Sequence, residues 1–415
     1  MKNFNNLYEE RISRVDTAIS LGKPDRVPCL VMYSSLPYVL MEDGTTYRDT
    51  YYDYERAGNA VLKFHGDYPI IDAANVGFTS GKSNEIAGST MIDWPGRPNT
   101  TVPNTSTHQV IEHEYMTRDE YPELLKDYTK FLLKKYIPSA FPGLKGLSSL
   151  DLNPSIILST TPLAGFYSPE ALEAYGKLAE ISKYDAEAAQ ASNMFAGKLG
   201  EMGIPPLMTG GAEVPFDVLG DYFRGTIGLL EDQMECPELI EEACELFADI
   251  QISQLQYFRY VQLPVKRVFI PLHKGMDGFM SSKQYEKLYW RPFKRIIDAL
   301  VEMDVVPIIY TEGKYNSRIQ QLADVPVGKT IIHFEDADMA KAKKVLGKTA
   351  CISGNFPIYL LEYGTKQRCV DYVKKLIDTC APDGGYIFDT SASVDNVKRE
   401  NLDAVLETVE VYGKY

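Results

Sequence analysis

The chain has 415 residues, of which 45% are hydrophobic and 24% are charged, a composition typical of a globular enzyme. Its formal net charge of −14 argues against a nucleic-acid-binding or anionic-membrane surface, because both need a basic face. No apolar stretch is long enough for a membrane span, and the first segment, MKNFNNLYEERISRV, has no apolar signal-peptide core. We therefore expect a cytoplasmic protein with no nucleic-acid or membrane partner.

Eight short apolar segments alternate with amphipathic helical stretches along the chain. Such alternation predicts parallel βα units, because strands buried on both faces read as continuous apolar runs. Eight units favour a closed (β/α)₈ barrel, an α/β fold of the TIM type, over an open sheet. The predicted strands are residues 27–33, 68–73, 204–211, 265–273, 305–313, 330–336, 349–357 and 385–391.

Residues 78–150 interrupt this alternation. They contain a polar run, GRPNTTVPNTST, followed by an acidic segment of helical character over residues 110–136. Long irregular insertions in compact enzymes often act as lids. We expect residues 1–415 to form one barrel domain, in which residues about 78–150 are an inserted cap over one end.

Polar side chains stand at the carboxyl ends of the last four predicted strands. They are Glu312, His333, Asn355 and Asp389, and His273 ends the strand before them. A βα barrel places its catalytic groups at this face. These positions are therefore the first candidates for a functional site.

Several motifs resemble the uroporphyrinogen decarboxylase superfamily. The runs ACISGNFPIYLLEYGTKQRCVDYVKKLID and GGYIF are similar to its closing strands, where a strand ending in Gly-Asn-x-Pro precedes a Gly-Thr turn. Residues 214–245 and 277–298 resemble the segments that follow its third and fourth strands. The resemblance runs from about Arg11 to the end of the chain and implies a (β/α)₈ barrel.

Differences between groups within the superfamily indicate which group this chain resembles. Uroporphyrinogen decarboxylases carry arginines after the first strand for a substrate with many carboxylates, whereas residues 31–40 contain no Arg or Lys. Methyltransferases that act on coenzyme M carry a His-x-Cys zinc motif where this chain has Glu312. Residues 112–141, 271–281 and 333–347 are instead similar to the methyltransferases of anaerobic O-demethylase systems. Those enzymes move a methyl group from an aryl methyl ether to a corrinoid protein.

That reaction needs a group that stabilises negative charge on the ether oxygen, because phenoxide is a poor leaving group. The resemblance implies that Co(I) of a corrinoid (cobalamin) is the nucleophile. A partner corrinoid protein would supply it, since the chain has no Asp-x-His-x-x-Gly run. Zinc or a general acid could stabilise the oxygen.

Glu312 and His333 are the first candidates for this role. They end neighbouring predicted strands, which lie ~5 Å apart, and we expect both at the barrel rim as metal ligands or as acid and base groups. His273 and Asp277 are the second catalytic candidates. A third zinc ligand would come from His273, Asp277, Glu213 or Asp389.

Aromatic and amide side chains near the strand ends are candidates for binding an aromatic substrate. They are Tyr33, Tyr310, Phe334, Asn355 and Phe356.

Each candidate also has a purely structural interpretation. The aromatic rings would pack in the core, Asn355 would be a turn residue, His333 and His273 would be packed or capping histidines, and Glu312 would belong to a salt-bridged loop. His65, His108 and His113 belong to no recognisable pattern and receive no role.

We therefore predict a corrinoid-dependent methyltransferase whose substrate is a small methoxylated aromatic. One alternative is a lyase of the uroporphyrinogen decarboxylase type, and another is a non-catalytic barrel that binds a corrinoid or another ligand. Tyrosine-rich helical segments leave a homodimer open.

Overall fold

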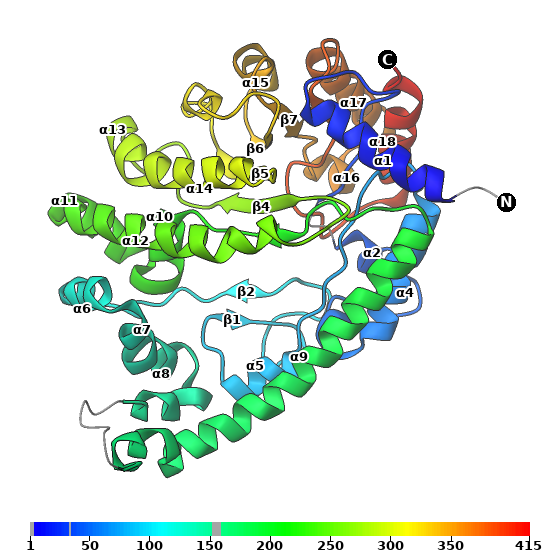
Figure 1. The fold of residues 1–415 in the computed structure, drawn as a ribbon. Coiled ribbons are helices and arrows are strands. Elements are labelled where there is room, and N and C mark those ends of the chain that lie inside the picture. The colour runs from blue at the N-terminus through cyan, green and yellow to red at the C-terminus, as the bar shows by residue number, and fades with distance from the viewer. Residues whose placement is uncertain (1–3, 33–34, 152–158) are drawn as a thin grey trace.

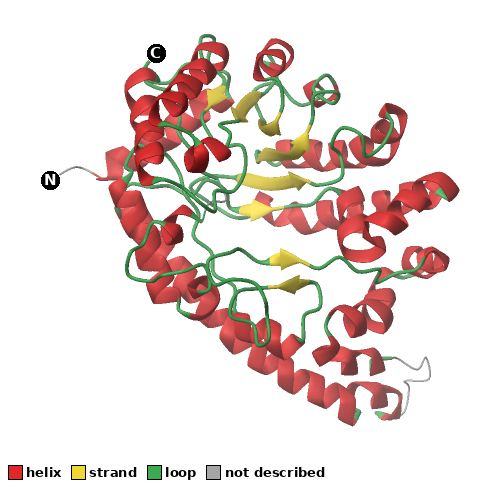
Figure 2. Ribbon diagram, turned by 180° about the vertical axis from the view of Figure 1, so that it is seen from behind, coloured by secondary structure: helices red, strands yellow, loops and turns green. Residues whose placement is uncertain are grey.

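The structure is a computed structural model that describes residues 4–32, 35–151 and 159–415. Figure 1 shows two groups of elements: a curved sheet wrapped in helices, and a smaller set of helices with a two-stranded ribbon. Figure 2 shows the same arrangement from behind, with one long helix running along the side of both groups. Within the described ranges, no helix combines the length and the apolar character that a bilayer crossing requires.

A six-stranded parallel sheet forms the centre of the larger group. Its order is β3-β4-β5-β6-β7-β8, so each strand pairs with its neighbour in sequence, and helices connect successive strands. This arrangement confirms the predicted α/β fold of βα units. The strands are β3 (Gly210–Gly211), β4 (Arg267–Leu272), β5 (Val306–Lys314), β6 (Ile331–Asp336), β7 (Cys351–Gly354) and β8 (Tyr386–Ile387), while β1 (Ile92–Asp93) and β2 (Gln109–Val110) form a separate antiparallel pair.

Helices cover the outside of this sheet and build the smaller group (Figure 1). They are α1 (Phe4–Ile19), α2 (Leu36–Val39), α3 (Asp49–Tyr52), α4 (Tyr54–Asp67), α5 (Gly81–Ala87), α6 (Tyr121–Lys126), α7 (Tyr128–Phe131), α8 (Ile137–Ala140), α9 (Pro169–Glu201), α10 (Pro215–Val218), α11 (Gly225–Glu235), α12 (Pro237–Leu255), α13 (Ser282–Gln284), α14 (Arg291–Glu302), α15 (Met339–Leu346), α16 (Tyr359–Tyr363), α17 (Lys366–Cys380) and α18 (Arg399–Tyr412).

Two irregular segments, residues 27–30 and 70–75, close the ring between β8 and β3. They stand where the first two strands were predicted, but prolines 28 and 69 remove backbone donors and leave few ladder hydrogen bonds. The eight predicted segments thus form a (β/α)₈ barrel, with two of them too irregular to be strands. The closing hydrogen bonds run from Leu30 N to Phe388 O (2.8 Å), Phe388 N to Pro28 O (2.8 Å), Asp72 N to Cys29 O (2.9 Å) and Ala74 N to Pro205 O (3.1 Å).

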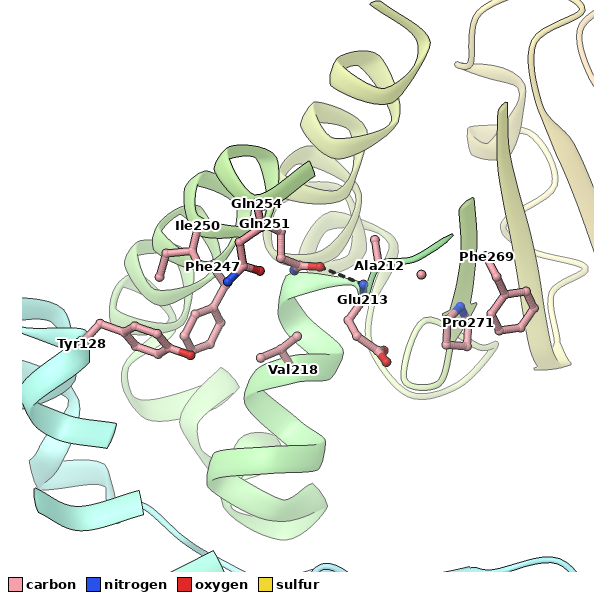
Figure 3. A pocket seen from close by; sticks show the side chains of 11 residues that line it. Tyr128, Ala212, Glu213, Val218, Phe247, Ile250, Gln251, Gln254, Phe269 and Pro271 are labelled. Carbon is pink, nitrogen blue, oxygen red and sulfur yellow. Dashed lines mark hydrogen bonds between the residues drawn. The ribbon is translucent and has the colours of Figure 1, made fainter. Parts of the chain in front are cut away.

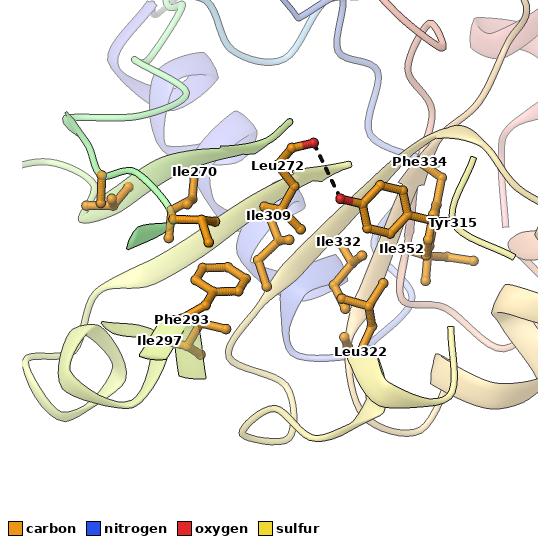
Figure 4. Close-up of a cluster of buried hydrophobic side chains, with 14 of the residues drawn as sticks. Ile270, Leu272, Phe293, Ile297, Ile309, Tyr315, Leu322, Ile332, Phe334 and Ile352 are labelled. Atoms are coloured by element: carbon orange, nitrogen blue, oxygen red, sulfur yellow. Dashed lines mark hydrogen bonds between the residues drawn. The ribbon is translucent and has the colours of Figure 1, made fainter. Parts of the chain in front are cut away.

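Successive side chains of the strands point to opposite faces and build two separate cores. The outward set, which includes Ile270, Ile309 and Ile332, is fully buried against helices such as α14 (Figure 4). The inward set draws a residue from each of the eight segments. Its members are Leu30, Ala73, Leu207, Phe269, Ile308, Ile331, Cys351 and Ile387. This alternation decides which residues near the strand ends can face a ligand.

Residues 78–150 lie in the smaller group, which includes α5, the β1–β2 pair and α6 to α8 (Figure 1). The long helix α9 packs on this group and on α4. Gly58 of α4 allows the close contact, because a Cβ there would stand 2.2 Å from the ring of Phe195. The assignment of these residues as a cap within a single domain stays a prediction.

A buried ionic network ties the first two barrel segments to α1. Asp72 is fully buried and accepts hydrogen bonds from Arg14 (2.7 Å), from both terminal nitrogens of Arg26 (2.8 Å each) and from the backbone N–H of Cys29 (2.8 Å). Asp25 pairs with the same Arg14. The network replaces the missing strand hydrogen bonds in this irregular part of the ring.

We expect the substitution Asp72→Ala to lower the free energy of unfolding by roughly 3–5 kcal/mol, because it leaves the buried Arg14 and the partly buried Arg26 without their shared carboxylate. Urea denaturation followed by circular dichroism measures the change. Asp67→Ala is the control: Asp67 pairs with Lys63 on an exposed surface, so its loss costs less than about 1 kcal/mol. Equal changes in the two variants would refute the role of the network.

Candidate active site

Polar side chains gather where the carboxyl ends of the strands meet. His273 follows β4, Glu312 lies in β5 and Glu335 lies in β6, and all three line one cavity. Two of these three residues, His273 and Glu312, were among the predicted site residues.

His273 is held between two carboxylates. Its Nδ1 lies 2.6 Å from Asp221 Oδ2, and its Nε2 lies 3.7 Å from Glu312 Oε1. Asp221 also forms an ion pair with Lys274. Because Asp221 occupies Nδ1, the nitrogen that faces Glu312 and the cavity is Nε2.

A second carboxylate fixes the backbone on which His273 stands. Asp217 is fully buried and accepts hydrogen bonds from the backbone N–H groups of His273 (2.9 Å) and Lys274 (3.0 Å) and from the hydroxyl of Tyr289 (2.7 Å). Asp217 and Asp221 are four residues apart in the helical segment after β3, so both face the end of β4.

Burial and neighbouring charges shift the proton affinities of this cluster. Burial by itself lowers the pKa of His273, but the hydrogen bond with Asp221 and the charges of Asp217 and Glu312 outweigh it and raise that pKa to about 9. Withdrawal from water raises the pKa of Glu312; the charge of His273 opposes this shift and that of Glu335 adds to it. His273 is therefore a cation at neutral pH, with a proton on Nε2 beside the cavity.

His333 lies one layer deeper and is fully buried. Its ring stacks on Tyr310, with centroids 4.3 Å apart, its Nε2 lies 3.2 Å from Ser391 O, and its Nδ1 lies 3.7 Å from Asp389 Oδ2. Burial lowers the pKa of His333 to about 4 and raises that of Asp389 to about 7. The predicted rim position of His333 is wrong, because this residue pairs in register with Tyr310, two positions before Glu312.

Glu312 and His333 consequently do not converge on one ion. Glu312 belongs to the rim with His273, whereas His333 stands below with Asp389. In the part of the chain that the structure describes, no three His, Cys, Asp or Glu side chains are arranged to hold a metal ion. The predicted pair of ligands does not fit a zinc site, which needs at least three protein ligands.

Asp277 and Asn355, two other predicted site residues, brace loops. The Asp277 carboxylate accepts hydrogen bonds from Ser317 N (3.1 Å) and Ser317 Oγ (2.6 Å). Asn355 is buried, and its Nδ2 donates to the carbonyl of Ala337 (3.1 Å). Neither side chain is among the described residues that line the cavity.

The predicted aromatic contacts divide between the two faces of the strands. Tyr310 faces inward and lines the cavity. Phe334 and Phe356 are fully buried in the outer core, where Phe356 packs on α17. Neither ring lines the described cavity, so neither is placed to contact a substrate there. Phe334 faces outward because it follows the inward-facing His333. Tyr33, the remaining prediction, lies outside the described residues.

The cavity has a volume of about 850 Å³ and is lined by aliphatic and aromatic side chains together with several polar groups. Thr107 and His108 of the inserted segment contribute to its wall. None of the described lining residues is Arg or Lys. Its rings and charged or imidazole groups are Tyr38, Tyr47, Phe64, Phe269 and Tyr310, and His65, His108, His273, Glu312 and Glu335.

A second cavity of about 610 Å³ shares Phe269 and Pro271 with the first (Figure 3). Glu213 lies on its wall, and the backbone N–H of Glu213 donates to Gln251 Oε1 (2.8 Å). Burial is the main cause that raises the pKa of this carboxyl to about 7. Glu213, a candidate third zinc ligand, thus faces a different cavity from Glu312.

Comparison with known families gives a match for this chain. A model of the family "Uroporphyrinogen decarboxylase (URO-D)" matches residues 168–412, more than half of the chain. The chain belongs to the uroporphyrinogen decarboxylase family. Among solved structures, a methyltransferase from Methanosarcina mazei superposes with a TM-score of 0.62 over 96% of this chain and 98% of that chain, at 13% sequence identity. At this identity the similarity shows a shared fold. No curated protein matches the chain in sequence.

Asp217 and Asp221, which hold His273 in place, were not predicted from the sequence. Asp217 and Asp221 occur in the run VPFDVLGDYF, inside a helical stretch rather than at a strand end. Their spacing of four was the available signal, since it places both carboxylates on one helical face. His65 and His108 also reach the cavity, and no spacing in the sequence connects them with it.

The raised pKa of His273 predicts a pH-dependent contribution to stability. The folded state holds this proton more tightly than the unfolded state, so the stabilisation is complete below the unfolded pKa near 6.5 and is lost as pH rises through about 9. We expect the difference in unfolding free energy between wild type and His273→Gln to shrink from pH 6 to pH 10, by an amount on the order of 1–3 kcal/mol. Urea titrations across this range measure it, and a constant difference would contradict the raised pKa.

Proposed function

We propose that this member of the uroporphyrinogen decarboxylase family is a corrinoid-dependent methyltransferase that demethylates a methoxylated aromatic compound. The methyl group goes to the reduced corrinoid of a partner protein. The observation that carries the proposal is the His273–Glu312 pair, with 3.7 Å between Nε2 and Oε1, on the wall of a cavity that aromatic and aliphatic side chains line.

The shape and lining of the cavity support a small aromatic substrate. Its volume of about 850 Å³ falls within the usual range for small-molecule sites. Phe269 and Tyr310 have ring centroids 5.4 Å apart on one wall, and Tyr38 and Tyr47 have centroids 5.6 Å apart on another. Such rings hold an arene by offset or edge-on contacts.

His273 would act as the acid for the leaving oxygen. A reduced corrinoid, when bound, supplies the electron pair that accepts the methyl group, and the ether oxygen then takes up negative charge. The proton on His273 Nε2 neutralises that charge, while Asp221 at Nδ1 keeps the imidazole oriented and stabilises its charged form. Glu312 lies on the opposite side of the imidazole ring from Asp221, next to Nε2, and orients the Nε2 proton toward the cavity.

Two alternative functions receive less support. A porphyrinogen decarboxylase must bind many carboxylates with cationic partners, and the described lining holds none from Arg or Lys but has the carboxylates of Glu312 and Glu335. A non-catalytic binding barrel would have no need of a histidine whose pKa is raised by surrounding carboxylates. Perturbed titratable groups in a cavity are typical of catalytic sites.

An anaerobic assay tests the proposal. The protein, with reduced cobalamin and a panel of methoxyphenols, is expected to consume the Co(I) absorbance with at least one donor. His273→Gln is expected to slow that transfer by roughly 10²–10⁴-fold, because it removes the acid. The wild-type rate is also expected to fall as pH rises through about 9, where His273 loses its proton.

His113→Gln provides the matched control, because His113 is exposed and does not line the described cavity. Its rate should equal that of the wild type. Full activity of His273→Gln would remove His273 from the mechanism. Absence of transfer from every donor, with a corrinoid protein also supplied, would overturn the methyltransferase proposal.

A further inference from the structure

The wall of the main cavity carries an excess of negative charge. Glu312 and Asp221 stand on the two sides of the His273 cation, and Lys274 pairs with Asp221. Glu335 is a further carboxylate on the same wall. The described lining residues include no Arg or Lys, so no such side chain on the cavity wall offsets the charge of Glu335.

The backbone holds Glu335 in this position. Its Oε2 accepts a hydrogen bond from the backbone N–H of Gly313 at 2.5 Å. Gly313 lies in the bulge of β5 with φ +78°, a conformation that favours glycine and turns this N–H toward the neighbouring strand. One oxygen of Glu335 thus accepts a hydrogen bond from the backbone, which holds the carboxylate at the cavity wall.

Aromatic rings form part of the wall of the same cavity. Tyr38, Tyr47, Phe269 and Tyr310 line the cavity together with Glu335. Their faces carry partial negative charge and attract a cation that has lost part of its water shell. Rings combined with carboxylates are the chemistry that binds quaternary ammonium groups.

We propose that this cavity accepts a second class of methyl donor, the quaternary methylammonium compounds. The inference rests on the proposed methyl transfer and extends it from ethers to cationic donors. In this transfer the C–N bond breaks and its electron pair stays on nitrogen. The methyl carbon forms its new bond with the electron pair supplied by a reduced corrinoid, and a neutral tertiary amine leaves.

This step needs no proton, and that separates the two donor classes. An aryl ether requires the acid at His273 Nε2, because its leaving group is an anion. A quaternary ammonium donor leaves as a neutral molecule, so Glu335 and the rings matter for its binding while the His273 proton does not enter the step.

Binding without any corrinoid tests the inference directly. Calorimetry compares choline with 3,3-dimethyl-1-butanol, an uncharged molecule of the same shape. Choline is expected to bind about tenfold more tightly. Glu335→Gln keeps an oxygen acceptor for Gly313 N–H but removes the charge, and should reduce this ratio at least about threefold. Glu312→Gln is the second variant and should lower it as well.

Glu410→Gln is the control for overall charge, because it removes one negative charge from an exposed position on α18. Its binding ratio should match that of the wild type. A wild-type ratio near one, or an unchanged ratio in both Glu335→Gln and Glu312→Gln, would overturn the inference.

Methyl transfer separates the failure of this inference from the failure of the proposed function. The expected result is that His273→Gln lowers transfer from methoxyphenols by roughly 10²–10⁴-fold and lowers transfer from choline by a much smaller factor, because only the ether step needs the proton. Transfer from methoxyphenols with no charge-dependent binding of choline would sink the inference and leave the proposed function standing. Charge-dependent binding of choline with no transfer from any donor would retain the site and refute the methyltransferase.

Discussion

The closed ring of parallel strands decides which side chains can meet in this protein. Because the side chains of a strand alternate with a period of two, Ile308, Tyr310 and Glu312 stand at successive heights on the inner face of β5. The lowest level, at Ile308, is apolar. The middle level carries the stacked rings of Tyr310 and His333. The highest level carries charge, as expected where water can reach it. A shift of one residue in β5 would turn Glu312 into the outer core.

The turn after β4 depends on a second constraint, the buried carboxylate of Asp217. A fully buried carboxylate is costly unless it is hydrogen-bonded, and Asp217 meets this requirement with two backbone N–H groups and the hydroxyl of Tyr289. Burial still raises its pKa to about 6. Two of its three donors belong to the turn that carries His273, so the same interactions hold the imidazole against Asp221.

The sequence was sufficient to predict most of the fold and part of the site. Continuous apolar runs predicted all eight barrel segments, and the rule that barrels act at strand ends selected His273 and Glu312. The depth of His333 depends on strand register, which a single sequence does not specify. The outward direction of Phe334 follows from side-chain alternation once His333 is known to face inward. Asp217 and Asp221 were missed because they come from a helix that folds across the strand end. Their spacing of four indicates a shared helical face but does not indicate which strand end that face meets.

The charged residues also show that the arrangement of side chains carries information that composition does not. The net charge of −14 excludes some partners, but it is summed over the whole surface and cannot identify a substrate. The cavity is informative because it places carboxylates among aromatic rings, with no Arg or Lys in the described lining. A barrel whose rim carries arginines suits polyanionic substrates, whereas this rim disfavours them by the same Coulomb interaction. The sign of the charge that a barrel presents at its rim therefore depends on a few residues at the strand ends, which are separate from the apolar side chains that fill the barrel below.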